Sequence, residues 1–167
     1  MQSEVNIPRL LEQIGQACQK MMAERNLEKP VIVGIRTGGV WLAQELRKRL
    51  NLNTEVGELD IAFYRDDFTR IGLNPRVQPS HLPFETEDKD ILLVDDVIMS
   101  GRTIRAAMNE LFDYGRPASI TLITLIDIGG RELPIQPDIV GKRLTLQPNE
   151  QIKLNGPEPL SLEIRKK

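Results

Sequence analysis

Cysteine is almost absent from this sequence, because Cys18 is the only one among 167 residues. A single thiol excludes an intramolecular disulfide and a metal cage built from several cysteines. No window approaches the roughly 18 consecutive apolar residues that span a bilayer, and the N-terminus lacks the basic start and apolar run of a secretory signal. We therefore expect a protein that is neither exported nor embedded in a membrane and that works in the reducing cytoplasm.

An excess of positive charge is also missing. Lys and Arg together number 22 and Asp and Glu 24, so the formal net charge of −2 does not favour a protein that coats a polyanion. Hydrophobic residues make up 40% and charged residues 28%, a balance typical of a folded globule rather than a disordered chain. At about 150 residues per domain, the length predicts one domain over residues 1–167.

Apolar runs and turns alternate along the first 127 residues in a way that predicts a strand-and-helix sequence. Helical spacing predicts helices over about 7–25, 40–50 and 104–112, and short apolar runs predict strands at 31–35, 91–94 and 119–126. Such alternation predicts an α/β fold, with a mostly parallel twisted sheet flanked by helices on both faces. Binding sites of such folds lie at the carboxyl ends of the strands.

Two segments depart from this alternation. Residues 65–83 are polar and proline-containing, and a stretch of that length inside a compact domain is usually a lid or a binding loop. From residue 128 onward, glycines and prolines separate short β-type pieces. We expect the last part of the chain, about 128–167, to form a small β-rich flap.

Residues 91–103 carry the clearest chemical signal, reading Ile-Leu-Leu-Val-Asp-Asp-Val-Ile-Met-Ser-Gly-Arg-Thr. Main-chain amides at a helix N-terminus are unpaired and lie at the positive end of the helix dipole, so the Ser100–Thr103 turn can hold a phosphate. Asp95 and Asp96 would repel that anion unless they accept hydrogen bonds from sugar hydroxyls or face a magnesium ion. A 5-phosphorylated sugar fits both halves of the segment.

Two other interpretations of the paired acids remain open at this point. Asp95 and Asp96 can cap the following helix, although a Ser-Gly-Arg-Thr turn exceeds what capping requires. The strand with its two acids also resembles the opening strand of response-regulator receivers, with Asp127 as phosphoacceptor. In those domains the acids lie near the start of the chain, whereas about ninety residues precede them here.

The same segment resembles the phosphoribosyl diphosphate (PRPP) motif of type I phosphoribosyltransferases at every position. Within that superfamily the chain is similar to the PyrR proteins, which are uracil phosphoribosyltransferases and pyrimidine operon attenuators. Matching stretches, besides 91–103, are residues 34–39, 59–67, 101–107, 115–117, 131–135 and 140–142. The resemblance implies the type I phosphoribosyltransferase fold with a flap, or hood, from the C-terminal third.

The implied reaction transfers ribose 5-phosphate from PRPP to uracil, giving UMP and pyrophosphate, with Mg²⁺ bound to PRPP. Catalytic roles fall on Asp95, Asp96 and Arg65, and Asp95 and Asp96 are also possible metal ligands. The expected 5′-phosphate site is Met99, Ser100, Gly101, Arg102 and Thr103. The expected pyrophosphate site is Arg36, Thr37, Gly38, Gly39 and Arg70. The loop at 65–83 is expected to close over PRPP and exclude water.

The acceptor base follows from one position in the phosphate turn. Related enzymes for 6-oxopurines carry an acid where this chain has Met99, and a thioether cannot exchange a proton with the purine ring. Uracil is therefore expected, near Asp127 and Arg131. The chain has Ile128-Gly129-Gly130 where the family commonly has Arg-Gly-His. Alternatives are a non-catalytic regulator that binds UMP or PRPP, and a transferase for another base.

A regulatory role is also implied by the resemblance. The family binds the leader RNA of pyrimidine genes through basic residues, of which Arg25, Arg131 and Lys142 are present here. Lys20 and Gln136 stand where the family usually has His and Arg. The family forms dimers and tetramers, so a homodimer or homotetramer is expected.

Overall fold

The computed structural model describes residues 5–27, 30–61 and 80–167. Its helices are α1 (Ile7–Arg25), α2 (Gly38–Leu50) and α4 (Arg102–Asp113). Five strands form the main sheet: β1 (Pro30–Ile35), β2 (Gly57–Leu59), β3 (Asp90–Ile98), β4 (Ser119–Asp127) and β5 (Ile139–Arg143). Two more, β6 (Glu150–Asn155) and β7 (Ser161–Lys166), form a separate antiparallel hairpin.

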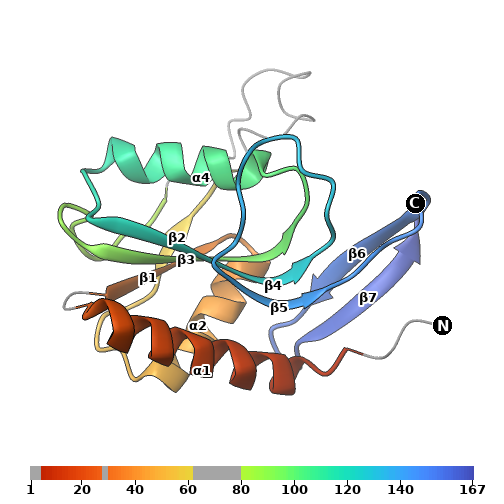
Figure 1. The fold of residues 1–167 in the computed structure, drawn as a ribbon, viewed down its shortest axis with the longest axis horizontal. Coiled ribbons are helices and arrows are strands. Elements are labelled where there is room, and N and C mark those ends of the chain that lie inside the picture. Colours follow the sequence, from red (N-terminus) through yellow and green to blue (C-terminus); the bar gives the residue numbers. More distant parts are fainter. Residues whose placement is uncertain (1–4, 28–29, 62–79) are drawn as a thin grey trace.

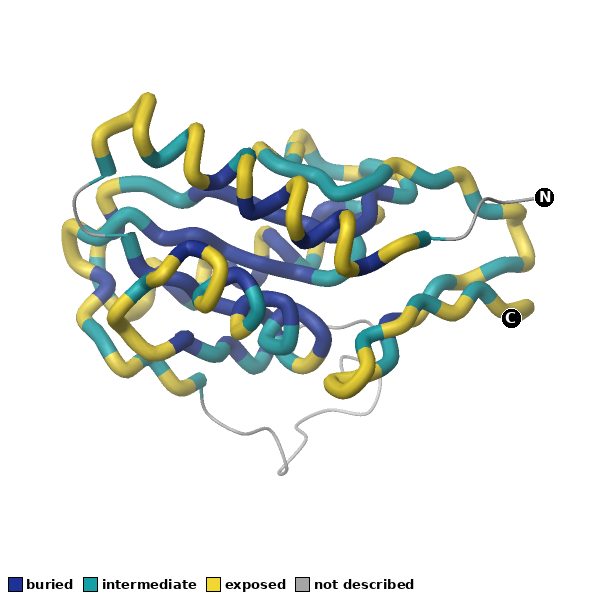
Figure 2. The backbone as a smooth tube through the Cα atoms, turned by 90° about the horizontal axis from the view of Figure 1, so that it is seen from below, coloured by how far each residue is buried: buried dark blue, intermediate teal, exposed yellow. Residues whose placement is uncertain are grey.

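The main sheet is entirely parallel, in the order β2-β1-β3-β4-β5. Helices α1 and α2 cover one face and α4 covers the other (Figure 1). The faces bury separate apolar clusters: Ile32, Leu92 and Ile123 pack under α1 and α2, and Val33, Leu93 and Leu122 pack under α4. Figure 2 shows the consequence, with buried sheet strands between helices whose outer turns are exposed. The predicted α/β sheet with helices on both faces is confirmed.

Helix α1 has the bounds that its sequence predicts, residues 7–25. Asn6 accepts a hydrogen bond from the amide of Arg9 at 3.1 Å, and Pro8 lies in the first turn, where its missing N–H is not needed. The helix ends at Asn26, which adopts a left-handed conformation. Cys18 lies on the inner face with no exposed surface, and burial raises the pKa of its thiol to about 12. This thiol is therefore a packing group rather than a nucleophile.

Strand β3 is longer than the apolar run predicts, because pairing with β4 continues through both acids to Ile98. The alternation of faces changes at this point: Val94 and Val97 belong to the same apolar cluster although three positions separate them. Asp95 and Asp96 occupy the irregular step, and their carboxylates accept hydrogen bonds from the amides of Asp96 and Val97. The acids are thus held by the sheet itself rather than by a loop after it.

Residues 128–167 divide into two structural parts. Strand β5 pairs in parallel with β4 and extends the main sheet, with Lys142 beside Ile126 and Arg143 beside Asp127. The β6–β7 hairpin lies outside that sheet (Figure 1), and its turn residues Pro157–Leu160 line a pocket together with Ile7 and Pro8 at the start of α1. Its turn packs on α2, since a Cβ at Gly156 would lie 3.0 Å from the Trp41 ring. The small antiparallel sheet agrees with the expected flap. Strand β5 lies within the range expected for the flap but belongs to the main sheet.

Candidate active site

The strand order creates a crevice between β1 and β3. From β1 the chain crosses to β2 on one side, whereas β3, β4 and β5 follow on the other side. Loops after two such strands diverge at their carboxyl ends and leave room for a ligand. The turn after β1 and the acids and turn of β3 therefore flank one site, as the sequence predicts.

The turn after β3 leads directly into α4. Gly101 has a φ of +95°, a left-handed conformation that glycine adopts without strain, and α4 begins at Arg102 with no side-chain cap. The hydroxyl of Ser100 accepts a hydrogen bond from the amide of Arg102 at 3.1 Å. No acidic residue lies in the first turn of α4. These features leave the positive end of the helix dipole available to an anion.

The turn after β1 approaches the acids of β3 closely. A Cβ at Gly38 would lie 2.5 Å from Asp96 Oδ2, and one at Gly39 would collide with the carbonyl oxygen of Val94. Helix α2 starts at these glycines, with Thr37 as an N-cap whose side chain makes no capping hydrogen bond. The sequence places residues 38 and 39 in a turn because glycine is a weak helix former. Here their missing side chains let the helix begin against β3.

Arg36 lies at the end of β1 and is positioned by β2. Its amide donates to the carbonyl of Leu59 at 2.9 Å, and its Nε donates to Glu58 Oε1 at 3.1 Å. A second carboxylate, Asp60 Oδ2, lies 3.7 Å from Nη1. The guanidinium is thus held beside the turn by two acids. Neither acid was singled out from the sequence, because each lies more than twenty residues from Arg36 along the chain.

The segment after β4 folds over the phosphate turn. Asp127 is 5% exposed and accepts hydrogen bonds from Arg131 Nη2 at 2.6 Å and from the amide of Gly129 at 2.9 Å. Burial acts to raise the pKa of Asp127, but these hydrogen bonds and the charges of Arg131 and Arg143 hold the pKa below its ordinary value. The carboxylate is therefore ionised at neutral pH.

Asp127 and Arg131 border a pocket of about 370 Å³ at the ends of β4 and β5. It is also lined by Ile128, Gly129, Gln136, Arg143, Leu144 and Thr145. Arg143, Leu144 and Thr145 were not singled out from the sequence, since their place beside Asp127 depends on the pairing of β5 with β4. The lining thus combines charged, amide and hydroxyl side chains with apolar ones, as small-molecule sites do.

A match to a family model decides between the remaining interpretations. Residues 6–154 match the model described as the phosphoribosyl transferase domain. A protein named Bifunctional protein PyrR from Pseudomonas paraeruginosa is 56% identical over 158 residues, which cover 95% of this chain and 93% of that protein. The chain belongs to the PyrR family of phosphoribosyltransferases. The resemblance identified from the sequence is confirmed, and the receiver interpretation of the paired acids is wrong.

Further comparisons agree with membership of the PyrR family. The Bifunctional protein PyrR of Nitrosococcus oceani is 54% identical over 163 residues, 96% of this chain and 92% of that protein. A hypoxanthine-guanine phosphoribosyltransferase from Bacillus anthracis superposes with a TM-score of 0.69 at 18% identity, covering 91% of this chain and 87% of that one. At that identity the structural likeness concerns the fold alone.

The sequence-predicted residues are therefore partly brought together. Gly38 of the 36–39 turn lies against Asp96, and the 99–103 turn follows the strand that carries Asp95 and Asp96. Arg65 and Arg70 lie outside the described residues. Of the expected loop at 65–83, residues 80–83 are described, and Ser80 accepts from the amide of Asp60 while His81 exchanges main-chain hydrogen bonds with Glu58. Within the described part of the chain, no three His, Cys, Asp or Glu side chains gather into a metal site.

The expected RNA-binding residues lie apart. Arg25 Nη1 donates to Thr121 near the start of β4, whereas Lys142 is paired with Ile126 near its end. Five residues of strand separate these two levels, which corresponds to about 16 Å along the sheet. Any single surface that uses both residues must therefore run along the outer edge of the sheet, over α1 and β5.

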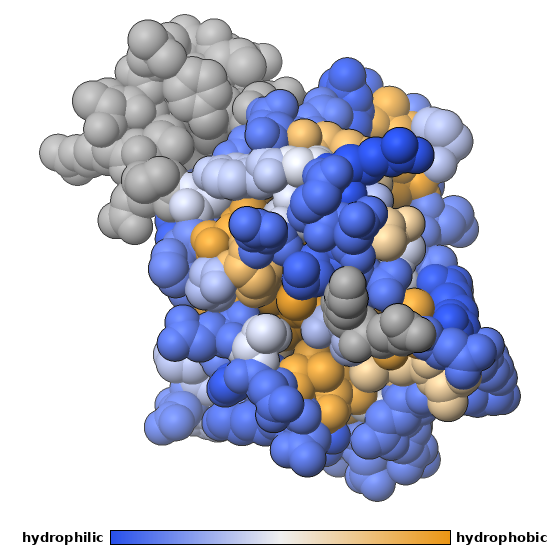
Figure 3. Space-filling model, turned by 90° about the vertical axis from the view of Figure 1, so that its left-hand side faces the viewer, coloured by the Kyte–Doolittle hydropathy of each residue, from blue (hydrophilic) through white to orange (hydrophobic). Residues whose placement is uncertain are grey.

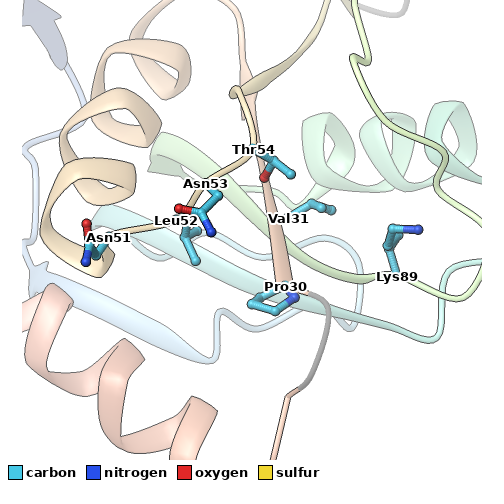
Figure 4. Close-up of a pocket in the computed structure, with 7 residues that line it drawn as sticks. All are labelled: Pro30, Val31, Asn51, Leu52, Asn53, Thr54 and Lys89. Carbon is cyan, nitrogen blue, oxygen red and sulfur yellow. The ribbon is translucent and has the colours of Figure 1, made fainter.

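A second pocket, of about 290 Å³, lies at the edge of the sheet where β1 and β3 begin, whereas the crevice lies where these strands end (Figure 4). Figure 3 views that edge, where apolar patches are separated by hydrophilic residues. Among the lining residues that the structure describes, Lys89 alone is charged. The C-terminal end of α2, the negative end of its dipole, borders the pocket at Asn51. This pocket is therefore poorly suited to a polyphosphate. None of the described helices is long and apolar enough to cross a membrane.

Proposed function

We propose that this phosphoribosyltransferase transfers ribose 5-phosphate from PRPP to uracil, giving UMP and pyrophosphate. The observation that carries the proposal is the approach of the β1–α2 turn to the acids of β3, with Gly38 against Asp96. Two helix N-termini without side-chain caps begin at this point, one on each side of the paired acids. PRPP has an anionic group at each end and hydroxyls between them. The two helix N-termini, with the paired acids between them, follow the same order.

Each part of the site has a role in this proposal. Met99, Ser100, Gly101, Arg102 and Thr103 hold the 5′-phosphate through main-chain donors and hydroxyls. Asp95 and Asp96 accept hydrogen bonds from the ribose hydroxyls. Arg36, Thr37, Gly38 and Gly39 bind the pyrophosphate, with Arg36 supplying the positive charge. Arg65 and Arg70 are proposed to meet the pyrophosphate from the loop that contains them.

The rate enhancement comes from positioning and from charge. Departure of pyrophosphate leaves positive charge on the ribose ring and adds negative charge on the leaving group. Asp95 and Asp96 lie on the side of the ribose, and Arg36 lies on the side of the leaving group. Fixed charges of both signs therefore face the atoms where opposite charge develops, and the two substrates are held for reaction rather than left to collide.

The acids of β3 fit a magnesium ion bound together with PRPP. Mg²⁺ prefers oxygen ligands and is often held by one or two carboxylates plus substrate phosphates. Asp95 and Asp96 supply carboxylate oxygens beside the place proposed for the pyrophosphate. When bound, the ion would neutralise charge on the leaving group. Among the described residues, these two side chains would then be sufficient as protein ligands for the ion.

The acceptor base is proposed to lie in the pocket bordered by Asp127 and Arg131. Met99 is 55% exposed in the adjoining turn and offers no proton to a purine ring. Gly130 lies against Met99, since a Cβ there would approach Met99 Cγ to 3.2 Å. Met99 thus lies next to Arg131 at the edge of the proposed base site, and its thioether favours a pyrimidine that needs no acidic partner.

The test is incubation of the purified protein with PRPP, Mg²⁺ and labelled uracil, followed by separation of UMP. We expect UMP and pyrophosphate in equal amounts. Hypoxanthine, guanine and adenine serve as parallel substrates. Product with a purine alone would support a transferase for another base, whereas no product with any base and tight binding of UMP would support a non-catalytic regulator.

We also propose that the chain regulates pyrimidine gene expression by binding the leader RNA of those genes in the cytoplasm, as a homodimer or homotetramer. The carriers are Arg25 at the end of α1 and Lys142 in β5, which lie near opposite ends of β4. A gel shift with that leader RNA over a range of salt concentrations tests this role. Binding that is absent or independent of salt would contradict it, because phosphate contacts release counterions. Analytical ultracentrifugation of the same preparation tests the assembly.

A further inference from the structure

Arg131 joins three separate parts of the chain. Its Nη2 donates to Asp127 at 2.6 Å, and its Nη1 donates to the carbonyl oxygen of Met99 at 2.8 Å. Its Nε donates to the carbonyl of Ile135 and to Gln136 Oε1, each at 2.7 Å. All three guanidinium nitrogens are therefore engaged, and one of their acceptors belongs to the phosphate turn. A planar fork with five N–H groups is the side chain suited to such a junction.

Main-chain contacts fasten the same two segments together. The carbonyl of Ser100 accepts hydrogen bonds from the amides of Glu132 at 2.9 Å and of Leu133 at 3.1 Å. Gly101 faces the side chains of Leu133 and Ile135, which a Cβ would meet at 3.5 and 3.4 Å. The turn over 99–101 therefore rests on residues 131–135. A displacement of one segment would move the other.

Burial distinguishes Arg131 from a neighbouring ion pair between the same segments. The side chains of Arg131 and Asp127 are 18% and 6% exposed, whereas Arg102 and Glu132, paired at 2.7 Å, are 59% and 58% exposed. Exposed pairs are screened by solvent and contribute little. A buried charge that loses its partner is far more costly, so the Arg131 junction holds the arrangement and the Arg102 pair does not.

We infer that Arg131 is a positioning residue for the 5′-phosphate site, in addition to bordering the base pocket. The inference rests on the proposed function, because it assigns the 99–103 turn to the sugar phosphate. Through the Met99 carbonyl, Arg131 fixes the amides that receive the phosphate, and through Asp127 it fixes the wall of the base pocket. The two substrates are thereby coupled through one side chain that need not touch the phosphate.

A ligand without a base separates this role from base recognition. The dissociation constants of ribose 5-phosphate and of Mg²⁺-pyrophosphate are measured by calorimetry for the full chain and for Arg131→Gln. We expect ribose 5-phosphate to bind about tenfold to a hundredfold more weakly in the variant, the range for one lost hydrogen bond to a charged group. Pyrophosphate, which is assigned to the 36–39 turn, keeps its wild-type affinity and serves as the control within the same molecule.

Two further variants sharpen the result. Glu132→Gln removes only the exposed pair with Arg102, and we expect it to bind ribose 5-phosphate as the wild type does. Arg131→Lys keeps the charge but cannot reach all of the acceptors, so its affinity is expected to lie between those of the wild type and Arg131→Gln. Full recovery in Arg131→Lys would overturn the geometric basis of the inference.

The outcomes distinguish this inference from the proposed function. If Arg131→Gln binds ribose 5-phosphate normally and loses only UMP affinity, Arg131 is a base contact and the inference is wrong. Equal loss of affinity for ribose 5-phosphate and for Mg²⁺-pyrophosphate means a general structural role and also overturns it. If the wild type itself binds neither ribose 5-phosphate nor PRPP, the proposed function fails and the inference fails with it.

Discussion

Replacement of Gly38 by alanine tests the geometry of the site most directly. The new Cβ would lie 2.5 Å from Asp96 Oδ2, 3.0 Å from its Cγ and 3.1 Å from its Cβ. Ordinary contacts between such atoms are about 3.5 Å, so the carboxylate or the turn has to move by about 1 Å. A misplacement of about 1 Å at a catalytic group costs about a hundredfold in rate. We therefore expect Gly38→Ala to lower kcat/KM for PRPP by about a hundredfold.

The free energy of unfolding of Gly38→Ala should rise or stay unchanged. Gly38 is the first residue of α2, and alanine is favoured over glycine in a helix by about 0.8–1 kcal/mol. Loss of activity without loss of the free energy of unfolding would thus separate a displaced carboxylate from a disrupted fold. The measurements are steady-state kinetics with PRPP and uracil, and denaturation by urea.

Gly15→Ala is the matched control. Gly15 lies in the middle of α1, and a Cβ there would meet Arg49 at 3.7 Å, an ordinary contact. This variant gains the same helix preference far from the crevice and is expected to keep wild-type activity. If Gly38→Ala retains more than about a tenth of the wild-type kcat/KM, where about a hundredfold loss is expected, the placement of Asp96 against the β1–α2 turn is refuted.

Three other predictions follow from single residues. Asp96→Asn should lower PRPP use by about a hundredfold or more while the fold persists by circular dichroism, and unchanged kinetics would contradict its role. The lowered pKa of Asp127 means that its ionised form stabilises the fold above the unfolded-state pKa of about 3.9, a contribution lost as pH falls through the folded-state value. The gap in unfolding free energy between wild type and Asp127→Asn should therefore shrink below about pH 4, and a gap independent of pH would disprove this. Lys142→Gln should weaken leader RNA binding and reduce the slope of log affinity against log salt by about 0.7, whereas an unchanged slope would remove Lys142 from the interface.

Local sequence patterns were sufficient to locate the crevice. The apolar runs at 31–35 and 91–94 predict strands buried on both faces. The turn after each run contains glycine and leads into a helix, and these local features are sufficient to predict phosphate binding. The resemblance to PyrR proteins rested on the same turns. Both kinds of inference depend on residues adjacent in the chain. The structure adds that Gly38 and Gly39 approach Val94, Asp95 and Asp96.

Features that depend on distant residues were not predicted. Strand β5 is a half-exposed edge strand containing Gly141, so its five residues lack the apolar signal of the inner strands. The extension of β3 through Asp95 and Asp96 arises from pairing with β4, which compensates for two acids in a strand. The partners of Arg36 and Arg131 likewise come from β2 and from the phosphate turn, and no spacing rule connects them.

The three described helices differ in how their first turns are satisfied. Asn6 closes the start of α1, whereas the N-caps of α2 and α4, Thr37 and Gly101, make no side-chain capping bond. Apart from the Ser100 hydroxyl at the amide of Arg102, both helices therefore begin at the crevice without side-chain acceptors. In the proposed function the sugar donor supplies those acceptors, so the native state gains stability with ligand supply, by about 2.7 kcal/mol at a concentration one hundred times the dissociation constant. The persistence of this protein against unfolding and proteolysis in a growing cell then follows the abundance of its own substrate, and starvation for that substrate shortens the lifetime of the enzyme.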